Sequence, residues 1–386
     1  MTRSVDPVLV EQVRLELARD PGPVTSGRVA AAVRSVGAVL GDLGLLDVTD
    51  ALKAELVGAG PLEPLLADPL VTDVLVNADR GVWVDRGQGL EQVRLRLGSE
   101  ADVRRLAVRL AATAGRRLDD ACPYVDARLP GGVRLHAVLP PLAQEGTHLS
   151  LRVPHRRVLT LDDLGTAGTV PPSWQPILRT VVESRCAFLV TGGTGCGKTT
   201  VLGGLLSLVP TCERVVVVED CSELRVDHPH VVRLESRPPN VEGQGAVTMT
   251  DLVRQALRMR PDRLVVGEVR GAEVRELLTA LNTGHEGGCG TIHANAAREV
   301  PARLEALAAL AGLQRDAVAA QAAGAIDLVL HLRRLGGLRR LTEIAVVQRG
   351  RTGLEVVPAL LAHESDPAAD GSRGPGWPAL RERLAR

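Results

Sequence analysis

The stretch GGTGCGKTT, residues 192–200, decides the fold of this 386-residue chain. Its glycines and the pair Lys198–Thr199 fit G-x-x-x-x-G-K-[ST], a loop whose backbone N–H groups and lysine wrap the phosphates of a nucleotide. The apolar residues 187–190 before it predict a buried strand, and residues 199–208 after it predict a helix. Because this motif requires a strand, a glycine loop and a helix in that order, the sequence predicts a nucleotide triphosphate site.

Lysine is rare in this chain, which makes Lys198 informative. Only two of the 46 lysine and arginine residues are lysines. A planar guanidinium is too large to replace a compact ammonium inside a phosphate-filled loop. The rarity therefore favours a phosphate loop over a chance glycine-rich turn, with Lys198 on the β- and γ-oxygens and the Thr199 hydroxyl on Mg²⁺. The residues expected to form the loop are Gly192, Gly193, Thr194, Gly195, Cys196, Gly197, Lys198, Thr199 and Thr200.

Composition limits the remaining function classes. The net charge is zero and aromatic residues make up 1% of the chain, so neither a basic track nor a stacking platform for bases is expected. The N-terminus lacks the apolar segment of a signal peptide, and no run approaches the ~18 apolar residues of a membrane span. Six cysteines without a C-x-x-C pair indicate free thiols in a reducing compartment. We expect a cytoplasmic protein that binds no nucleic acid directly and reaches membranes only through partners.

The hydrophobic periodicity divides the chain into five parts. Residues 1–59 predict a helical N-terminal extension, and 60–154 predict a smaller α+β domain. A linker at 155–172 leads to an α/β domain at 173–364, where strands alternate with helices as in a mainly parallel sheet. Residues 365–386 predict a flexible tail with a short terminal helix. The strands expected in the α/β domain are 187–191, 214–220, 263–269, 290–294, 327–332 and 341–347.

Acidic residues follow two of these strands. Glu219 and Asp220 end an apolar strand, with Glu223 just beyond, and adjacent carboxylates are costly unless a cation or water network is present. Glu268 follows residues 264–267 as in the second acidic motif of phosphate-loop NTPases, although Gly267 stands where aspartate is usual. We interpret Glu268 as polarising the attacking water, and both Glu219 and Glu268 as holding Mg²⁺ through water. A polar loop start remains the alternative for Glu219.

Two histidines lie near the next predicted strand. His285 ends Asn-Thr-Gly-His at 282–285, and His293 lies in Thr-Ile-His-Ala-Asn at 291–295. No third ligand of fixed spacing supports a metal, so we interpret the pair as sensors of the γ-phosphate, with ordinary packed histidines as the alternative. The loop, the two acidic sites and the histidines are all expected to end strands of one sheet.

Hydrolysis also needs positive charge on the γ-phosphoryl oxygens. Arg134 and Arg152 lie on two predicted strands of the preceding domain, close to the linker. If the two domains clamp the nucleotide, these arginines can reach it from their own subunit or from a neighbour.

Taken together, these motifs resemble a known family. The stretches that carry the resemblance are GGTGCGKTT, VVVVEDCSEL, HPHVVRLESRPPNVEG, DLVRQALRMRPDRLVVGEVRG and TGHEGGCGTIHAN. In this order and spacing they are similar to the type II/type IV secretion ATPase superfamily. The N-terminal stretches GPLEPLLADPLVTDVLVN and GRRLDDACPYVDARLPGGVRLHAVLPPLA resemble its tight-adherence (Tad/Flp) pilus assembly, or CpaF-like, branch.

The resemblance implies a RecA-like motor domain in a homo-hexameric ring that hydrolyses ATP with Mg²⁺. Such a motor adds pilin subunits through an inner-membrane platform protein and lies at the inner face of the cytoplasmic membrane. The implied roles are the catalytic acid for Glu268, the acidic box for Glu219 and Glu223, the histidine box for His285 and His293, and γ-phosphate contacts for Arg134 and Arg152.

Other functions are compatible with the same motifs. The ATPase of a conjugative or type IV secretion channel is the first alternative, and neighbouring pilin or relaxase genes discriminate it from pilus assembly. A nucleotide-binding scaffold with little turnover is the second, and it would show no more ATPase activity than Lys198→Ala. A RecA-like recombinase or helicase would show DNA-stimulated hydrolysis.

Overall fold

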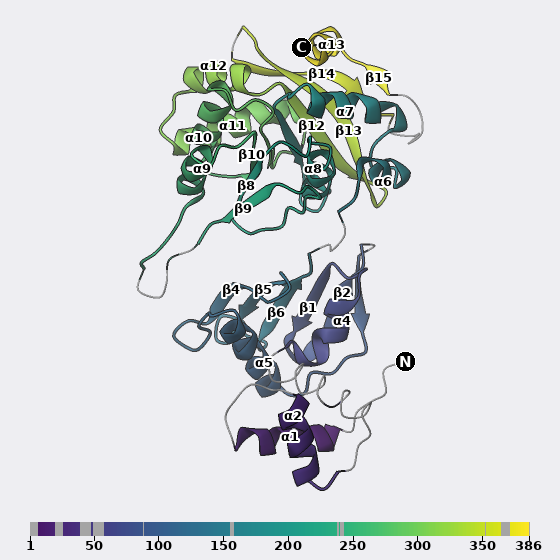
Figure 1. Cartoon of the computed structure of the whole chain (residues 1–386), viewed down its shortest axis with the longest axis vertical. Helices are drawn as coiled ribbons and strands as arrows, with labels where there is room; N and C mark the ends of the chain where they lie inside the picture. Colours follow the sequence, from purple (N-terminus) through teal and green to yellow (C-terminus); the bar gives the residue numbers. More distant parts are fainter. Residues whose placement is uncertain are drawn as a thin grey trace. The chain divides into compact units, whose positions relative to one another are not determined.

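The computed structural model describes residues 7–19, 26–38, 48, 58–87, 89–154, 158–237, 239, 243–351, 353–363 and 371–385. The chain divides into two compact units, Met1–Arg156 and Arg157–Arg386 (Figure 1). Within the predicted N-terminal extension, α1 (Pro7–Ala18) and α2 (Ser26–Ser35) form the expected helices. The rest of that extension lies mostly outside the described residues.

The first unit is built around one antiparallel sheet, with strand order β3-β2-β1-β6-β5-β4. Two hairpins form within this sheet, because β1 pairs with β2 and β4 pairs with β5 in antiparallel register. Alternate strand residues and one face of α5 (Glu100–Thr113) form its core, and a Ser99–Asp102 capping box begins that helix. The bounds are α4 Glu63–Ala67, β1 Asp73–Asn77, β2 Val82–Asp85, β3 Leu90–Val93, β4 Tyr124–Arg128, β5 Arg134–Val138 and β6 His148–Arg152.

The second unit contains a nine-stranded sheet with strand order β15-β14-β13-β12-β7-β11-β10-β8-β9. The strands from β12 to β9 pair in parallel, and β12 to β15 pair in antiparallel fashion. The predicted α/β fold with a mainly parallel sheet is therefore confirmed. The bounds are β7 Phe188–Gly192, β8 Val215–Glu219, β9 Val231–Glu235, β10 Arg263–Val269, β11 Cys289–Ile292, β12 Leu328–Leu335, β13 Leu338–Arg349, β14 Leu354–Leu361 and β15 Ser372–Arg373.

Helices cover both faces of this sheet, so its central strands are buried on both sides. In β8, Val215 and Val217 face one core whereas Val216 and Val218 face the other. Each buried valine contributes roughly 1.5–3 kcal/mol to stability. Helices α6 (Leu161–Thr166), α7 (Gln175–Glu183), α8 (Lys198–Leu206) and α13 (Trp377–Leu384) contribute to the first core. The second core is covered by α9 (Met249–Leu257), α10 (Val274–Asn282), α11 (Val300–Leu310) and α12 (Arg315–Ala325).

The linker and the tail need correction. The predicted linker 155–172 contains α6, whose Leu161 and Leu164 are buried in the core of the second unit. In the predicted tail, the expected terminal helix is present as α13, whose Leu380 is fully buried, whereas residues 372–373, expected to be flexible, form β15 and pair with β14. Apolar anchors outweigh the Pro- and Gly-rich composition that suggested a loop. Among the described residues, the helices all lack the length and apolar character that a bilayer crossing requires.

Candidate nucleotide-binding site

The predicted phosphate loop joins β7 to α8. The loop turns at Gly195 and Gly197, whose φ angles of 70° and 92° suit glycine. The Lys198 ammonium curls back and donates hydrogen bonds of 2.9 Å to the carbonyls of Gly192 and Gly193. Since α8 begins at Lys198, its positive N-terminal end and the ammonium meet at the same loop, which is an arrangement that attracts phosphate.

Close packing explains the first glycine of the loop. A Cβ atom at Gly192 would lie 2.4 Å from the carbonyl oxygen of Leu332 and 2.6 Å from Sγ of Cys196. The Cys196 side chain is buried beneath the loop, and burial raises the pKa of its thiol, although the charges of Lys198 and Arg339 act in the opposite sense. Cys196 is therefore a packed thiol that holds the loop against its neighbours.

Glu219 ends β8 as a buried carboxylate, with 3% of its surface exposed. One oxygen, Oε1, accepts hydrogen bonds from the backbone N–H groups of Glu223 (3.0 Å) and Leu224 (2.8 Å). The other, Oε2, is buried without a hydrogen-bond partner among the described residues. Burial raises the pKa of Glu219 to about 7. A buried, half-satisfied carboxylate of this kind is suited to a cation or an ordered water.

Gly267 stands where the second acidic motif usually has aspartate, and the structure gives the reason. A Cβ atom at this position would lie 2.5 Å from Cγ of Glu219, so the side chain of Glu219 occupies the space above it. The carbonyl of Gly267 accepts a 2.6 Å hydrogen bond from Thr291 Oγ1 on β11. The register of β10 with β11 shifts between Val266 and Val269, so half-buried Glu268 lies at an irregularity of strand β10.

An ion pair that the sequence did not predict lies beside these acids. Arg270 follows β10 and pairs with Asp220, which follows β8. Asp220 directly follows Glu219 in the sequence, but nothing in the sequence indicates which arginine pairs with it. With 44 arginines in the chain, neither composition nor spacing could single Arg270 out.

The strand order brings most predicted site residues to one edge of the sheet. Strands β7, β11, β10 and β8 are neighbours and parallel, so the phosphate loop, His293, Glu268 and Glu219 all lie at the carboxyl edge. This is the edge where parallel α/β sheets bind ligands. The placement predicted for these four groups is confirmed.

His285 does not share this edge, and its predicted placement is wrong. It lies in the connection from α10 to β11, and connections that lead into parallel strands lie at their amino ends. The backbone agrees, because the N–H of Phe188, the first residue of β7, donates to the carbonyl of Gly288 at 3.3 Å. Nδ1 of His285 lies 3.3 Å from the carbonyl oxygen of Ala280, in the last turn of α10.

The glycines that follow His285 have a packing role. A Cβ atom at Gly287 would lie 2.0 Å from Nη1 of Arg263. Arg263, 2% exposed, forms an ion pair of 2.6 Å with Glu213 and donates to the carbonyl of Val182 at 3.0 Å. Part of the histidine-rich stretch therefore closes over a buried ion pair at the amino edge.

Arg134 and Arg152 lie side by side in the first unit. The register pairs Arg134 of β5 with Arg152 of β6, and it pairs Arg128 of β4 with Arg134. Three arginines thus form one row across neighbouring strands. Leu135, next to Arg134 on β5, is fully buried in the core, so the row lies on the opposite face of the sheet. Arg128 was missed because only the strand register reveals that it joins the row.

A metal site made of protein ligands alone is absent from the described part of the chain, where no group of three or more His, Cys, Asp or Glu residues could hold an ion. Mg²⁺ needs no such cage, because it is commonly held by one or two carboxylates, waters and substrate phosphates. The buried Oε2 of Glu219 and the hydroxyl of Thr199 fit that donor set. The residues present are therefore compatible with a magnesium nucleotide.

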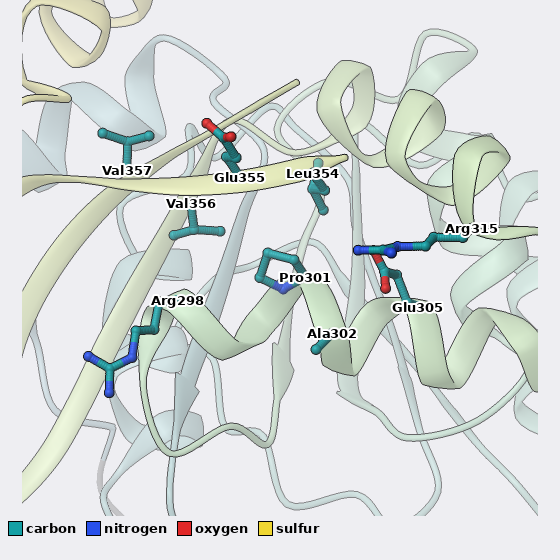
Figure 2. Close-up of a pocket in the computed structure, with 9 residues that line it drawn as sticks. All are labelled: Arg298, Pro301, Ala302, Glu305, Arg315, Leu354, Glu355, Val356 and Val357. Atoms are coloured by element: carbon teal, nitrogen blue, oxygen red, sulfur yellow. The ribbon is translucent and has the colours of Figure 1, made fainter. Parts of the chain in front are cut away.

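Two other polar features lie away from the loop. A cavity of about 370 Å³ lies between α11 and β14. Figure 2 shows the residues that line it, among them Arg315 and Glu305, which form a 3.0 Å ion pair. None of the predicted site residues lines it.

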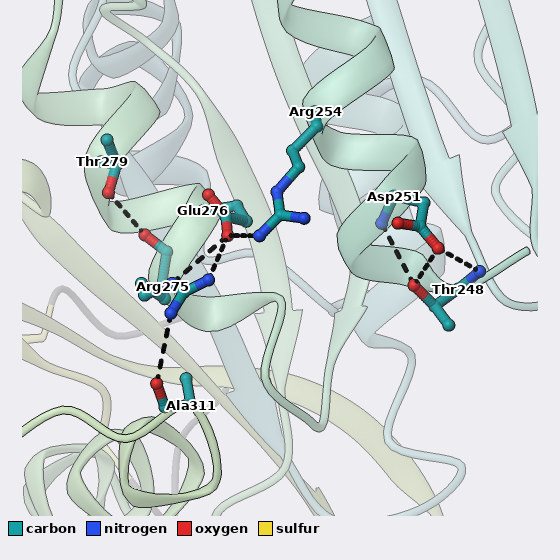
Figure 3. A network of polar contacts seen from close by, with 7 residues as sticks. All are labelled: Thr248, Asp251, Arg254, Arg275, Glu276, Thr279 and Ala311. Atoms are coloured by element: carbon teal, nitrogen blue, oxygen red, sulfur yellow. Dashed lines mark hydrogen bonds and ion pairs between the residues drawn. The ribbon is translucent and has the colours of Figure 1, made fainter.

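Figure 3 shows Glu276 of α10 accepting hydrogen bonds from Arg254 of α9 and from Arg275, at 2.8 and 2.9 Å. This network ties two helices that cover the sheet, so part of the DLVRQALRMR stretch has a structural role.

Comparison with known proteins places these features in a family. The model of the "Type II/IV secretion system protein" family matches residues 55–337. The chain is 55% identical over 326 residues to a Mycobacterium tuberculosis protein named "Putative conjugal transfer protein MT3759", covering 83% of this chain and 93% of that one. It is 32% identical over 290 residues to the conjugal transfer protein TrbB of Rhizobium radiobacter, covering 73% and 85%.

A solved structure shares the fold. The pilus retraction motor PilT with bound ADP is similar with a TM-score of 0.54 and 20% identity, covering 84% of this chain and 87% of that one. The RecA-like fold expected from the resemblance is thereby confirmed. The chain belongs to the type II/IV secretion system protein family.

Proposed function

We propose that this protein is a Mg²⁺-dependent ATPase that drives a type II/IV secretion machine. The observation that carries the proposal is the meeting of two opposite charges at one sheet edge. The Lys198 ammonium donates to a loop carbonyl at the end of β7. The buried carboxylate of Glu219 and the half-buried Glu268 lie at the carboxyl ends of β8 and β10, which neighbour each other in the same sheet. A phosphate-binding loop and two carboxylates at the same edge of one sheet supply the groups that phosphoryl transfer to water uses.

Each residue then has a role in the proposed reaction. Lys198 and the N-terminus of α8 bind the β- and γ-phosphates, and Glu268 orients the attacking water. Thr199 would hold Mg²⁺ directly, with Glu219 and Glu268 acting through water, and the bound ion would neutralise charge on the phosphate oxygens. His293 contacts the γ-phosphate, while Glu223 holds Glu219 through its backbone N–H.

The arginine row completes the proposal from the first unit. Arg134 and Arg152, with Arg128 beside them, would stabilise charge on the γ-phosphoryl group from the same subunit or from a neighbour in a homo-hexamer. We leave His285 out of the proposed site of its own subunit, because it precedes β11 and so lies at the other edge of the sheet.

The relatives favour one kind of machine. Both reported relatives are named as conjugal transfer proteins, so we place a conjugation-type secretion channel ahead of Tad/Flp pilus assembly. Pilus assembly is the second candidate, on the strength of the N-terminal stretches that resemble that branch. In either system the protein would act at the cytoplasmic face of the inner membrane through a platform protein, without handling nucleic acid itself.

Turnover and oligomer mass test the enzymatic proposal. The purified protein is expected to hydrolyse ATP with Mg²⁺ as a hexamer, and Lys198→Ala is expected to abolish hydrolysis. Wild-type turnover no higher than that of Lys198→Ala would favour a nucleotide-binding scaffold instead. To distinguish the two systems, a gene-deletion strain is scored for plasmid transfer and for surface pili. Loss of plasmid transfer would indicate a conjugation channel, and loss of pili would indicate pilus assembly.

A further inference from the structure

The hairpin formed by β12 and β13 extends past the phosphate loop. Strand β7 ends at Gly192, which pairs with Leu332, whereas β12 continues to Leu335. The hairpin turns at Gly336 and Gly337, whose φ angles are 55° and 89°. Its tip therefore lies beyond the carboxyl edge of the sheet, directly beside the strand that carries the loop.

One side chain of this hairpin contacts the loop itself. Arg339 Nε donates a 3.0 Å hydrogen bond to the carbonyl of Gly195, in the middle of the loop. Its aliphatic stem covers the residue before α8, since a Cβ atom at Gly197 would lie 3.3 Å from Cδ of Arg339. Lys198 and Arg339 thus both donate to carbonyls of one nine-residue segment, one from inside the loop and one from the hairpin.

The tip concentrates positive charge in an unfavourable way. The register sets Arg334 directly opposite Arg339 and Arg333 directly opposite Arg340. Like charges opposite one another destabilise an antiparallel pair. Arg340 is buried and donates to the carbonyl of His363, so its charge is committed to the fold. The charge on Arg339, in contrast, lies at the predicted phosphate loop.

We propose that Arg339 is a second cation of the nucleotide site, supplied by the β12–β13 hairpin of the same subunit to the phosphates of ATP and ADP. The inference rests on the proposed function. A guanidinium offers a planar fork of donors that matches phosphate oxygens, and the loop beneath it is a phosphate cradle. The family model ends at residue 337, so it assigns nothing to this position.

Nucleotide titration of the full-length protein tests the assignment. Arg339→Ala is expected to raise the Kd of both ATP and ADP by about tenfold, the effect of losing one charge-assisted hydrogen bond. Arg339→Lys keeps the charge but not the fork and is expected to give an intermediate Kd. The matched control is Arg349→Ala, an exposed arginine at the other end of β13, which is expected to bind like wild type.

The outcomes separate the inference from the proposed function. If Lys198→Ala loses binding while Arg339→Ala binds like Arg349→Ala, the inference is overturned and the nucleotide site stands. If Lys198→Ala binds ATP normally, the proposed function itself fails.

Inorganic triphosphate, which has no base, separates a phosphate contact from a base contact. Arg339→Ala is expected to weaken its binding by the same factor as that of ATP, and to flatten the salt dependence of both. Weaker ATP binding with unchanged triphosphate binding would contradict the phosphate contact.

Discussion

The side chain of Glu219 lies across Gly267, where a Cβ atom would approach its Cγ to 2.5 Å. Glu219 ends β8 and Gly267 lies on the neighbouring strand β10, so the absence of a side chain at Gly267 makes room for the buried carboxylate of Glu219. The glycine that replaces the usual aspartate of the acidic motif is therefore explained by the position of the Glu219 side chain.

Gly267→Ala tests this relationship. The added methyl group must displace Glu219, so we expect a loss of about 1–3 kcal/mol in the free energy of unfolding, typical of overpacking, together with loss of ATPase activity. The control is Gly27→Ala, where no atom lies within 4 Å of the added Cβ. Chemical denaturation of both variants measures the difference, and equal stability would show that Glu219 moves aside without cost.

Glu219→Gln is expected to change the pH dependence of stability. Burial raises the pKa of Glu219 to about 7, above its ordinary value of 4.5, so the folded state binds more protons than the unfolded state between these pH values. The contribution of Glu219 to the free energy of unfolding of the wild type is fully present below pH 4.5 and is lost as the pH rises through 7. Without Mg²⁺, the glutamine variant should gain on wild type across that range, by up to roughly 3 kcal/mol. A constant difference from pH 4 to 8 would contradict the assignment.

His331 is expected to show the opposite slope. It lies on β12 with 3% of its surface exposed, and neither ring nitrogen has a hydrogen-bond partner among the described side chains. Burial, helped by the charge of Arg333, lowers its pKa from 6.5 to about 4. The unfolded chain therefore binds more protons between these values, and stability from this group is lost as the pH falls through them.

His331→Leu removes this proton and keeps an apolar side chain in the strand. Wild type should lose up to roughly 3 kcal/mol relative to the variant between pH 6.5 and pH 4. Thermal unfolding at several pH values measures this loss. Parallel curves for the two proteins would mean that His331 titrates normally.

The buried Arg263–Glu213 pair predicts a large effect of one neutral substitution. Glu213→Gln leaves the guanidinium of Arg263 without a compensating charge, and breaking a buried pair in this way costs about 3–5 kcal/mol. Glu305→Gln breaks the pair with Arg315, whose side chain is 69% exposed, and should cost at most about 1 kcal/mol. Similar unfolding free energies for the two variants would contradict the burial of the Arg263–Glu213 pair at the amino edge of the sheet.

Sequence patterns predicted the elements whose residues obey one clear rule. The strand before Gly192 and the valine run before Glu219 follow the burial rule, and the structure contains both. Strand β9, with the sequence VVRLE, was not predicted, because it lies at the edge of the sheet and Arg233 interrupts its short run of apolar residues.

Contacts between distant segments could not be predicted in the same way. Arg128 joins the arginine row only through strand register, and Arg339 reaches the loop only because β12 pairs with β7. His285 is different, since a signal was present. It precedes a predicted strand, and that order alone places it at the amino edge of a parallel sheet.

The central claim is that the carboxyl edge of the sheet hydrolyses ATP, with Glu268 orienting the water. The most direct measurement compares ATP binding and steady-state turnover of wild type and Glu268→Gln in the same preparation. We predict that the variant binds ATP with wild-type affinity and turns it over at least about a hundredfold more slowly, the scale of losing a positioned catalytic group. Wild-type turnover by Glu268→Gln would contradict the account.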